Sequence, residues 1–171
     1  MKEETKYIAD LFVKNYHSLR KAFKWTDEIA KRMSAYLFAI EGKEVDIEAI
    51  KAKRQLIKSR VGAFSAFRGT SEFSLASLLA IHKERDDLFD RTKMIYDRLK
   101  RERMRNSDYL VLSAYTIALL SNDINADQAV LRTREYYQNL KNHHSVLAGT
   151  DDYVTATLVG VSSKDIDQTI L

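Results

Sequence analysis

No proline interrupts this chain of 171 residues, and only five glycines are spread along it. Proline and glycine supply most tight turns, so a sandwich or barrel of many short strands would lack its turn residues here. The composition is otherwise that of a folded protein, with 45% hydrophobic and 30% charged residues. We therefore expect an all-α protein, long enough for one domain with a sizeable core.

Signals for the start of a helix recur along the chain. A hydroxyl residue followed by an acidic residue precedes an apolar run at Thr26, Thr70, Ser107 and Thr150. Such a hydroxyl caps free backbone N–H groups, and a carboxylate suits the positive end of a helix. The intervals of 44, 37 and 43 residues are typical of a helix–turn–helix repeat. The spacing predicts an array of α–α hairpins, an α-solenoid or superhelix.

The predicted array divides the single all-helical domain into one helix and a series of hairpins. The boundaries are an N-terminal helix over 1–25, hairpins over 26–69, 70–106 and 107–149, and an incomplete fourth hairpin over 150–171. The last segment is still apolar at Ile166, Ile170 and Leu171, whereas an array normally finishes with a polar capping helix. We therefore expect a fragment of a longer array. A closed helical bundle is the alternative, because local helix patterns do not fix superhelical order.

The first helix of each predicted hairpin is the more apolar one. In the first hairpin its apolar residues are Ile29, Met33, Tyr36, Leu37 and Ile40. Short helices that are apolar on most sides are expected to lie between neighbouring helices. This pattern predicts that the helix after Thr26 is buried.

Aromatic and aliphatic residues also stand at the predicted boundaries between units. Trp25 precedes the Thr26 cap, where a hydrophobic staple residue packs against the first turn. Phe64, Phe67, Val146 and Leu147 lie in two connections that both end in Gly-Thr. We expect Trp25 to serve packing, and the other four residues to be buried plugs.

The second helix of each hairpin is predicted to be amphipathic and charged. Its expected caps are Asp46, Asp86, Asn125 and Ser163. Gly42 stands where a helix ending in the left-handed conformation requires glycine. These residues place the turns of the array.

Charge is unevenly distributed. Residues 1–106 carry 24 basic and 16 acidic side chains, whereas residues 107–171 carry 4 basic and 8 acidic ones. A basic half can bind nucleic acid, orient two copies of a protein, or keep it in solution. The densest basic run, Arg98 to Arg105, does not form one clean stripe on a helix. Nucleic-acid binding is therefore the least favoured of the functions considered below.

The sequence lacks the residues that several kinds of chemistry require. The chain has no cysteine, which excludes disulfides, cysteine-ligated metals and thiol nucleophiles. The glycines fit neither the Walker spacing nor the dinucleotide fingerprint, and no His-Glu-x-x-His pair occurs. No apolar run approaches the ~18 residues of a membrane span, and the charged start does not read as a secretory signal. We expect a cytoplasmic protein with no membrane partner and no cofactor.

One polar cluster could carry chemistry. His143, His144, Asp151 and Asp152 lie within ten residues, and imidazole with carboxylate can bind a divalent metal or transfer a proton. The simpler interpretation is that the histidines end one helix and the aspartates begin the next, where their charges suit the helix dipoles. No catalytic or metal-binding residue is therefore assigned, and these four remain the candidates.

Arg68 stands between Phe67 and Gly69 in an apolar turn. It could form a structural ion pair with a neighbouring unit, or bind an anion beside the helix that follows Thr70. The ion pair is favoured, because arginine is the usual residue of partly buried ion pairs. Arg68 is the one candidate binding residue.

Three segments together resemble one bacterial family. They are Phe23-Lys24-Trp25, the run from Val61 to Gly69, and Gly149-Thr150-Asp151-Asp152-Tyr153. The family is an uncharacterised Firmicute group of all-helical proteins, catalogued as a domain of unknown function (number 4003). The resemblance covers most of the chain and implies members nearly twice as long. Ala156 and Thr157 depart from the family's Leu-rich run, and the family supplies no activity or site residues.

The sequence leaves several functions to compare. We expect a non-catalytic protein-binding, peptide-binding or scaffold module, because a hairpin array offers a concave binding surface. The alternative is an enzyme or metal-binding protein that uses the histidine–aspartate cluster, and the third is nucleic-acid binding through the basic N-terminal half. A protein or peptide is the expected partner, and a homo-oligomer is compatible with the charge asymmetry.

Overall fold

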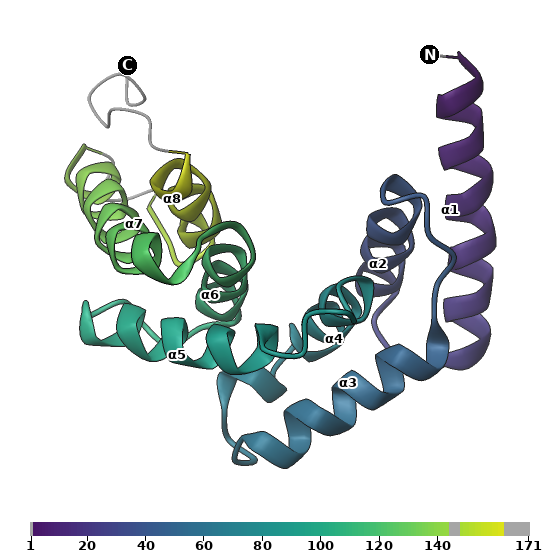
Figure 1. The fold of residues 1–171 in the computed structure, drawn as a ribbon, viewed down its shortest axis with the longest axis horizontal. Helices are drawn as coiled ribbons and strands as arrows, with labels where there is room; N and C mark the ends of the chain where they lie inside the picture. The colour runs from purple at the N-terminus through teal and green to yellow at the C-terminus, as the bar shows by residue number, and fades with distance from the viewer. Residues whose placement is uncertain (1, 144–147, 163–171) are drawn as a thin grey trace. The chain divides into compact units, whose positions relative to one another are not determined.

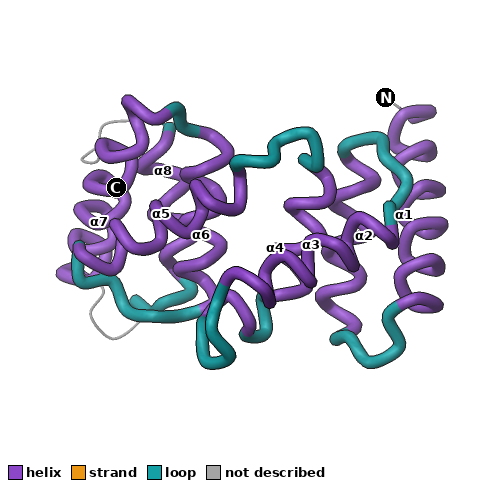
Figure 2. The backbone as a smooth tube through the Cα atoms, turned by 60° about the horizontal axis from the view of Figure 1, so that its bottom comes forward, coloured by secondary structure: helices purple, strands orange, loops and turns teal. Residues whose placement is uncertain are grey.

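The computed structural model describes residues 2–143 and 148–162, and this part of the chain is all-helical, which confirms the predicted fold class. Figure 1 traces the helices in chain order and Figure 2 shows that no strand occurs among them in the described residues. The helices are α1 (Lys2–Ala22), α2 (Glu28–Ile40), α3 (Ile47–Arg60), α4 (Glu72–Ile81), α5 (Leu88–Arg101), α6 (Asp108–Leu120), α7 (Asp123–His143) and α8 (Asp152–Val161), with a short 3₁₀ turn, η1 (Ala66–Arg68).

The chain forms two compact units, which we call unit 1 (Met1–Asp86) and unit 2 (Asp87–Leu171). In unit 1, α2 packs against α1 and α4, and α3 packs against α4 (Figure 1). In unit 2, α6 packs against α5 and α8, and α7 packs against α8. The second and fourth helices of each unit therefore pack together, and the first and third each pair with one of them.

The two units also match in sequence at equivalent helices. Ser34-Ala35-Tyr36 in α2 corresponds to Ser113-Ala114-Tyr115 in α6, and Gly69-Thr70 before α4 corresponds to Gly149-Thr150 before α8. The closest helix pairs are α1 with α2, α3 with α4, α5 with α6, and α7 with α8. The predicted hairpins instead joined α2 to α3 and α4 to α5. The solenoid order of the hairpins remains a prediction.

Local signals placed some helix ends correctly. Asp46 and Ser107 cap α3 and α6 by accepting backbone N–H groups, as predicted. Gly42 has φ +65°, and the next residue donates its N–H to the carbonyl of Phe38 at 2.9 Å. This hydrogen bond closes a Schellman motif, in which glycine is favoured because a Cβ is disfavoured there.

Other caps lie a few residues from their predicted positions. Asp27, not Thr26, caps α2 by accepting the N–H of Ala30. The residue before α5 is Asp87 rather than Asp86. Asn125 lies inside α7, and its N–H donates to the side chain of Asn122. The cap of α2 changes from a hydroxyl to a carboxylate, whereas the other two corrections keep the predicted residue type. The predicted cap Ser163 lies outside the described residues.

The plugs predicted at the unit boundaries are only partly correct. Phe67 is buried in η1, as predicted, but Phe64 and Trp25 are almost fully exposed, so the packing role expected of both is wrong. Phe23 takes the place expected for Trp25, and its ring meets Phe73 of α4 edge-on with centroids 5.0 Å apart. In each of these two turns one aromatic residue is buried, Phe23 or Phe67, and a second one, Trp25 or Phe64, is exposed to solvent. Val146 and Leu147 lie outside the described residues.

Candidate functional site

The structure does not assemble a site from the histidine–aspartate cluster within its described residues. His143 is the exposed last residue of α7, and His144 lies outside the described residues. Asp151 is the exposed residue before α8, while Asp152 accepts the backbone N–H of Gly149 at 2.9 Å. In residues 2–143 and 148–162, no group of three or more histidine, aspartate or glutamate side chains is placed to hold a metal ion.

Arg68 ends η1 and is half-buried. Its backbone N–H donates to the carbonyl of Ser65, and its side chain forms no ion pair with any described residue. The ion pair of this region is formed instead by Arg54 and Glu72. Anion binding by Arg68 remains a prediction.

Glu72, the acidic residue of the predicted helix start after Thr70, is a buried carboxylate. It lies in the first turn of α4, where Arg54 Nε of α3 donates to its Oε1 at 2.9 Å and Lys58 Nζ lies 3.7 Å from the same oxygen. Its position at the N-terminus of α4 also favours the negative charge. This group joins α3 to α4 and is structural.

The most unusual surface of unit 1 is the outer side of α2. Ile29, Met33, Tyr36 and Ile40 are each 46–70% exposed, although all four were predicted to be buried. Their spacing of four, three and four residues places them within one narrow stripe of the helix. We call this stripe the α2 face. It is a continuous row of large apolar side chains with no described helix packed over it.

The opposite side of α2 explains why this stripe points outward. The buried residues there are Lys31, Ser34, Ala35, Phe38 and Ala39. Small side chains allow α2 to approach α4 closely, and the hydroxyl of Ser34 donates to that of Ser77 at 2.9 Å. Apart from Lys31 and Phe38, the inward side therefore consists of small residues that permit close approach and hydrogen bonding.

Lys31 completes the inward side and would not be found by hydrophobic pattern alone. Its side chain is only 1% exposed, and its ammonium donates to the carboxylate of Glu28 at 2.6 Å. Tyr16 of α1 donates to the same carboxylate at 2.8 Å, and the Lys31 and Tyr16 bonds together lower the pKa of Glu28. A lysine is rarely buried unless it is paired, and here the pairing is supplied within one turn of the helix.

Exposed charges of both signs adjoin α2: Lys24 and Asp27 precede it, Arg32 lies within it, and Glu41 follows it. Arg32 is exposed at the flank of the stripe, with its guanidinium 5.8 Å from the ring centre of Tyr16. Lys24 is exposed just before Trp25, which is itself exposed. The nearest acidic group on α2, Glu28, is already bonded to Lys31 and Tyr16. Arg32, four residues before Tyr36, therefore places a positive charge beside the centre of the stripe, which favours a negatively charged neighbour there.

A pocket of about 360 Å³ lies where α2 and α4 end, next to the loop that leads into α3. Its lysines are already engaged: Lys43 Nζ donates to the carbonyl of Ile81 at 2.9 Å, and Lys83 Nζ donates to Asp46 at 3.0 Å. The bond from the Ala49 N–H, followed by that from Lys83, lowers the pKa of Asp46. The polar groups of this pocket hold helix ends together and leave no cation free for a ligand.

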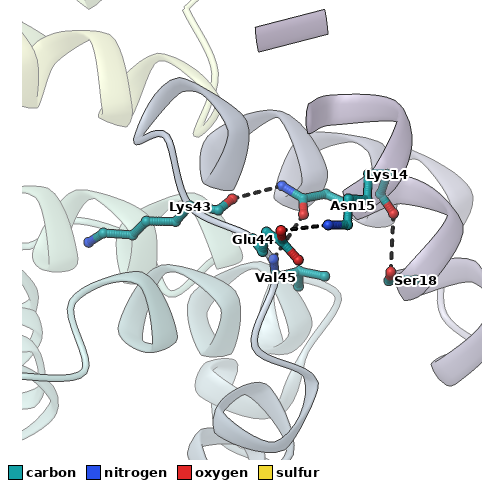
Figure 3. Close-up of polar contacts among 6 residues, drawn as sticks. All are labelled: Lys14, Asn15, Ser18, Lys43, Glu44 and Val45. Atoms are coloured by element: carbon teal, nitrogen blue, oxygen red, sulfur yellow. Dashed lines mark hydrogen bonds and ion pairs between the residues drawn. The ribbon is translucent and has the colours of Figure 1, made fainter. Parts of the chain in front are cut away.

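Asn15 of α1 fixes the loop beside that pocket, as Figure 3 shows. Its buried side chain donates to the carbonyl of Lys43 at 3.0 Å and accepts the N–H of Val45 at 2.9 Å. Lys14, the preceding residue, forms an ion pair with Glu44 of the same loop. Because two loop backbone groups are satisfied by one amide, this segment is held rigidly against α1.

Comparisons with known proteins identify a family for this chain. The family model described as "Protein of unknown function (DUF4003)" matches residues 15–170. The chain is 25% identical over 170 residues to "Uncharacterized protein YeaA" of Bacillus subtilis (strain 168). The aligned region covers 96% of this chain and 50% of that protein. The chain thus spans about half the length of this relative. No solved structure matches. In the described residues, no helix is long and apolar enough to cross a membrane. The chain belongs to the DUF4003 family of proteins of unknown function.

Proposed function

We propose that this protein is a non-catalytic binding module, and that the α2 face docks an α-helix of a partner protein. The observation that carries the proposal is the exposure of Ile29, Met33, Tyr36 and Ile40 in one stripe. Large apolar side chains that line up on a surface in this way are typical of interaction sites, whereas single exposed ones are ordinary.

The spacing of the stripe indicates what shape of partner fits it. Steps of four, three and four residues are those by which two helices pack side by side over successive turns. A partner helix with its own apolar residues at the same spacing would interdigitate with Met33 and Tyr36 at the centre. A flat sheet or an extended peptide would not follow this spacing.

The charge beside the stripe indicates the chemistry of the partner. Arg32 is exposed beside its centre, and the carboxylate of Glu28 is already bonded within the protein. An amphipathic helix with acidic residues beside its apolar row therefore fits best, since opposite charges steer association and fix its orientation. We commit to such an acidic amphipathic helix as the occupant.

A photo-crosslinking residue at Tyr36 tests this proposal in the cell that makes the protein, with the same residue at exposed Gln55 of α3 as the matched control. The expected product at Tyr36 is a cross-link to a single partner protein. The cross-linked segment of that partner should be an acidic amphipathic helix. Met33→Glu in the same chain should abolish that product, because it introduces a charge into the apolar row. Arg32→Glu should weaken it, because it reverses the flanking charge.

Two results would overturn the proposal. One is equal cross-linking from Tyr36 and Gln55, which would mean that the stripe has no preferred occupant. The other is a cross-link from Tyr36 to a second copy of this chain, which would replace the acidic partner with self-association. Circular dichroism of each variant checks that the helices are retained.

A further inference from the structure

Unit 2 contains a second pocket, of about 200 Å³, where the turn after α5 meets α7 and α8. It is independent of the α2 face, which lies in unit 1. The side chains that define it are four cations and two tyrosines: Arg103, Arg105, Arg134, Lys141, Tyr137 and Tyr153. The pocket is smaller than those that enclose a whole drug-sized molecule, and its volume suits a single chemical group.

The charge of this pocket is largely uncompensated. The single carboxylate among its lining residues is Glu102, which lies 3.5 Å from Arg134. Arg103, Arg105 and Lys141 form no ion pair with any residue in the described part of the chain. By contrast, Arg98 on the nearby last turns of α5 pairs with Asp127 at 2.7 Å. What distinguishes Arg103, Arg105 and Lys141 is that all three line the same pocket.

Arg103 occupies a backbone position where glycine is the usual residue. Its φ is +61°, and among the described non-glycine residues it is the one with a positive φ. It follows Glu102 at the end of α5, where its N–H donates to Lys100 and the N–H of Met104 donates to Leu99. This is the same Schellman ending that Gly42 provides for α2. An arginine here accepts backbone strain and places its guanidinium at the pocket.

Two tyrosines form the uncharged wall of the pocket. Tyr153 is buried, its hydroxyl accepts the backbone N–H of Arg105 at 3.0 Å, and its ring meets Tyr137 edge-on with centroids 4.6 Å apart. Burial, followed by the neighbouring Tyr153, raises the pKa of Tyr137. Tyr137 therefore stays neutral at physiological pH and adds a hydroxyl rather than a negative charge to the pocket.

We propose that this pocket of unit 2 binds the phosphoryl group of inorganic phosphate or of a small phosphate monoester. A phosphoryl group near neutral pH carries up to two negative charges and three acceptor oxygens, which match the three unpaired cations Arg103, Arg105 and Lys141. Arginine forks suit phosphate geometry, and lysine adds a point charge. A carboxylate would offer only one charge and two oxygens to the same cations.

Arg103→Gly tests the proposal without threatening the fold, because glycine is favoured at a positive φ. Isothermal titration of the full chain with sodium phosphate, at constant ionic strength, measures the dissociation constant. We expect saturable binding to the unmodified chain and a dissociation constant about tenfold higher for Arg103→Gly, since a charge-assisted contact is lost. Arg101→Ala, at the exposed last residue of α5 and outside the pocket, is the control and should bind as the unmodified chain does.

The same titration with O-phospho-L-serine identifies the source of the phosphoryl group. Binding at least as tight as that of phosphate indicates a monoester, whereas binding of phosphate alone indicates the free ion, and both support the site. Titration with acetate at the same ionic strength should show no saturable binding. Three results would overturn the proposal: no saturable phosphate binding, unchanged affinity in Arg103→Gly, or an equal loss in Arg101→Ala.

Discussion

At the scale of single residues, helix ends are set by side chains that act within one turn. Asp46 caps α3 through the N–H of Ala49 at 2.9 Å, and the same carboxylate pairs with Lys83. Both contacts favour the ionised form, and the cap is the larger cause of its lowered pKa. Because the cap needs only its own segment, the sequence identified this residue correctly.

The pH dependence of Asp46 follows from the direction of its pKa. A carboxylate whose pKa is lowered by folding stabilises the fold above its unfolded pKa, and this stabilisation is lost as pH falls through the folded pKa. We expect Asp46→Ala to lower the free energy of unfolding by about 1 kcal/mol at pH 7. Asp46→Asn keeps a capping oxygen and should therefore lower the free energy of unfolding by less than Asp46→Ala does.

Urea denaturation at pH 7 and at pH 3 checks this expectation. The difference in the free energy of unfolding between the unmodified chain and Asp46→Asn should be present at pH 7. It should shrink below about pH 4, where the carboxylate takes up a proton. A difference that stays constant over this range, or grows at low pH, would show that the charge of Asp46 contributes nothing.

At the scale of helix pairs, α7 and α8 approach each other closely at Gly160. A Cβ added to Gly160 would stand 2.8 Å from Thr133 Oγ1 and 2.9 Å from the Thr133 backbone nitrogen. Thr133 is buried and its hydroxyl donates to the carbonyl of Ala129 at 2.7 Å, so it has little room to move. The equivalent position of unit 1, Ala80, carries the methyl group that Gly160 lacks.

Gly160→Ala is therefore expected to destabilise the protein even though alanine favours a helix. The clash with backbone should lower the free energy of unfolding by about 1–3 kcal/mol, measured by urea denaturation. Gly62→Ala is the matched control, because a Cβ there meets nothing within 4 Å, and its effect should stay within about 0.5 kcal/mol. Stability of Gly160→Ala equal to that of the unmodified chain would contradict this close packing.

The orientation of α2 shows where prediction from sequence stops at this scale. The apolar spacing of Ile29, Met33, Tyr36 and Ile40 correctly indicated a helix, but the side assigned to the core was wrong. The spacing defines a stripe and not the direction in which it points. Burial of Lys31 and Ser34 depends on partners that become neighbours only after folding.

At the scale of the whole molecule, the chain contains two compact units with the same pattern of helix packing. In unit 1, Glu72 links α3 to α4 through Arg54 and Lys58. Removing one member of a largely buried ion pair leaves the others without compensation. Such a change should therefore act first within the unit that contains it.

Glu72→Ala tests whether unit 1 responds by itself. We expect the free energy of unfolding to fall by about 2 kcal/mol, below the cost of a fully buried pair because Arg54 keeps some contact with water. Hydrogen exchange should accelerate in α3 and α4 while α7 and α8 keep their rates. The control is Glu48→Ala, an exposed partner of Lys51, with an effect below about 1 kcal/mol. Equal acceleration in both units would contradict separate units.

The sequence alone determined the helical class, some helix ends with the approximate positions of the others, and the family resemblance. These depend on turn residues, capping side chains and hydrophobic spacing, all of which act over a few neighbouring residues. The tertiary structure alone decided that Trp25, Phe64 and the α2 face lie outside, and that Arg103 and Lys141 line one pocket. These facts depend on which distant segments meet, and a local pattern contains no information about partners that lie far along the chain.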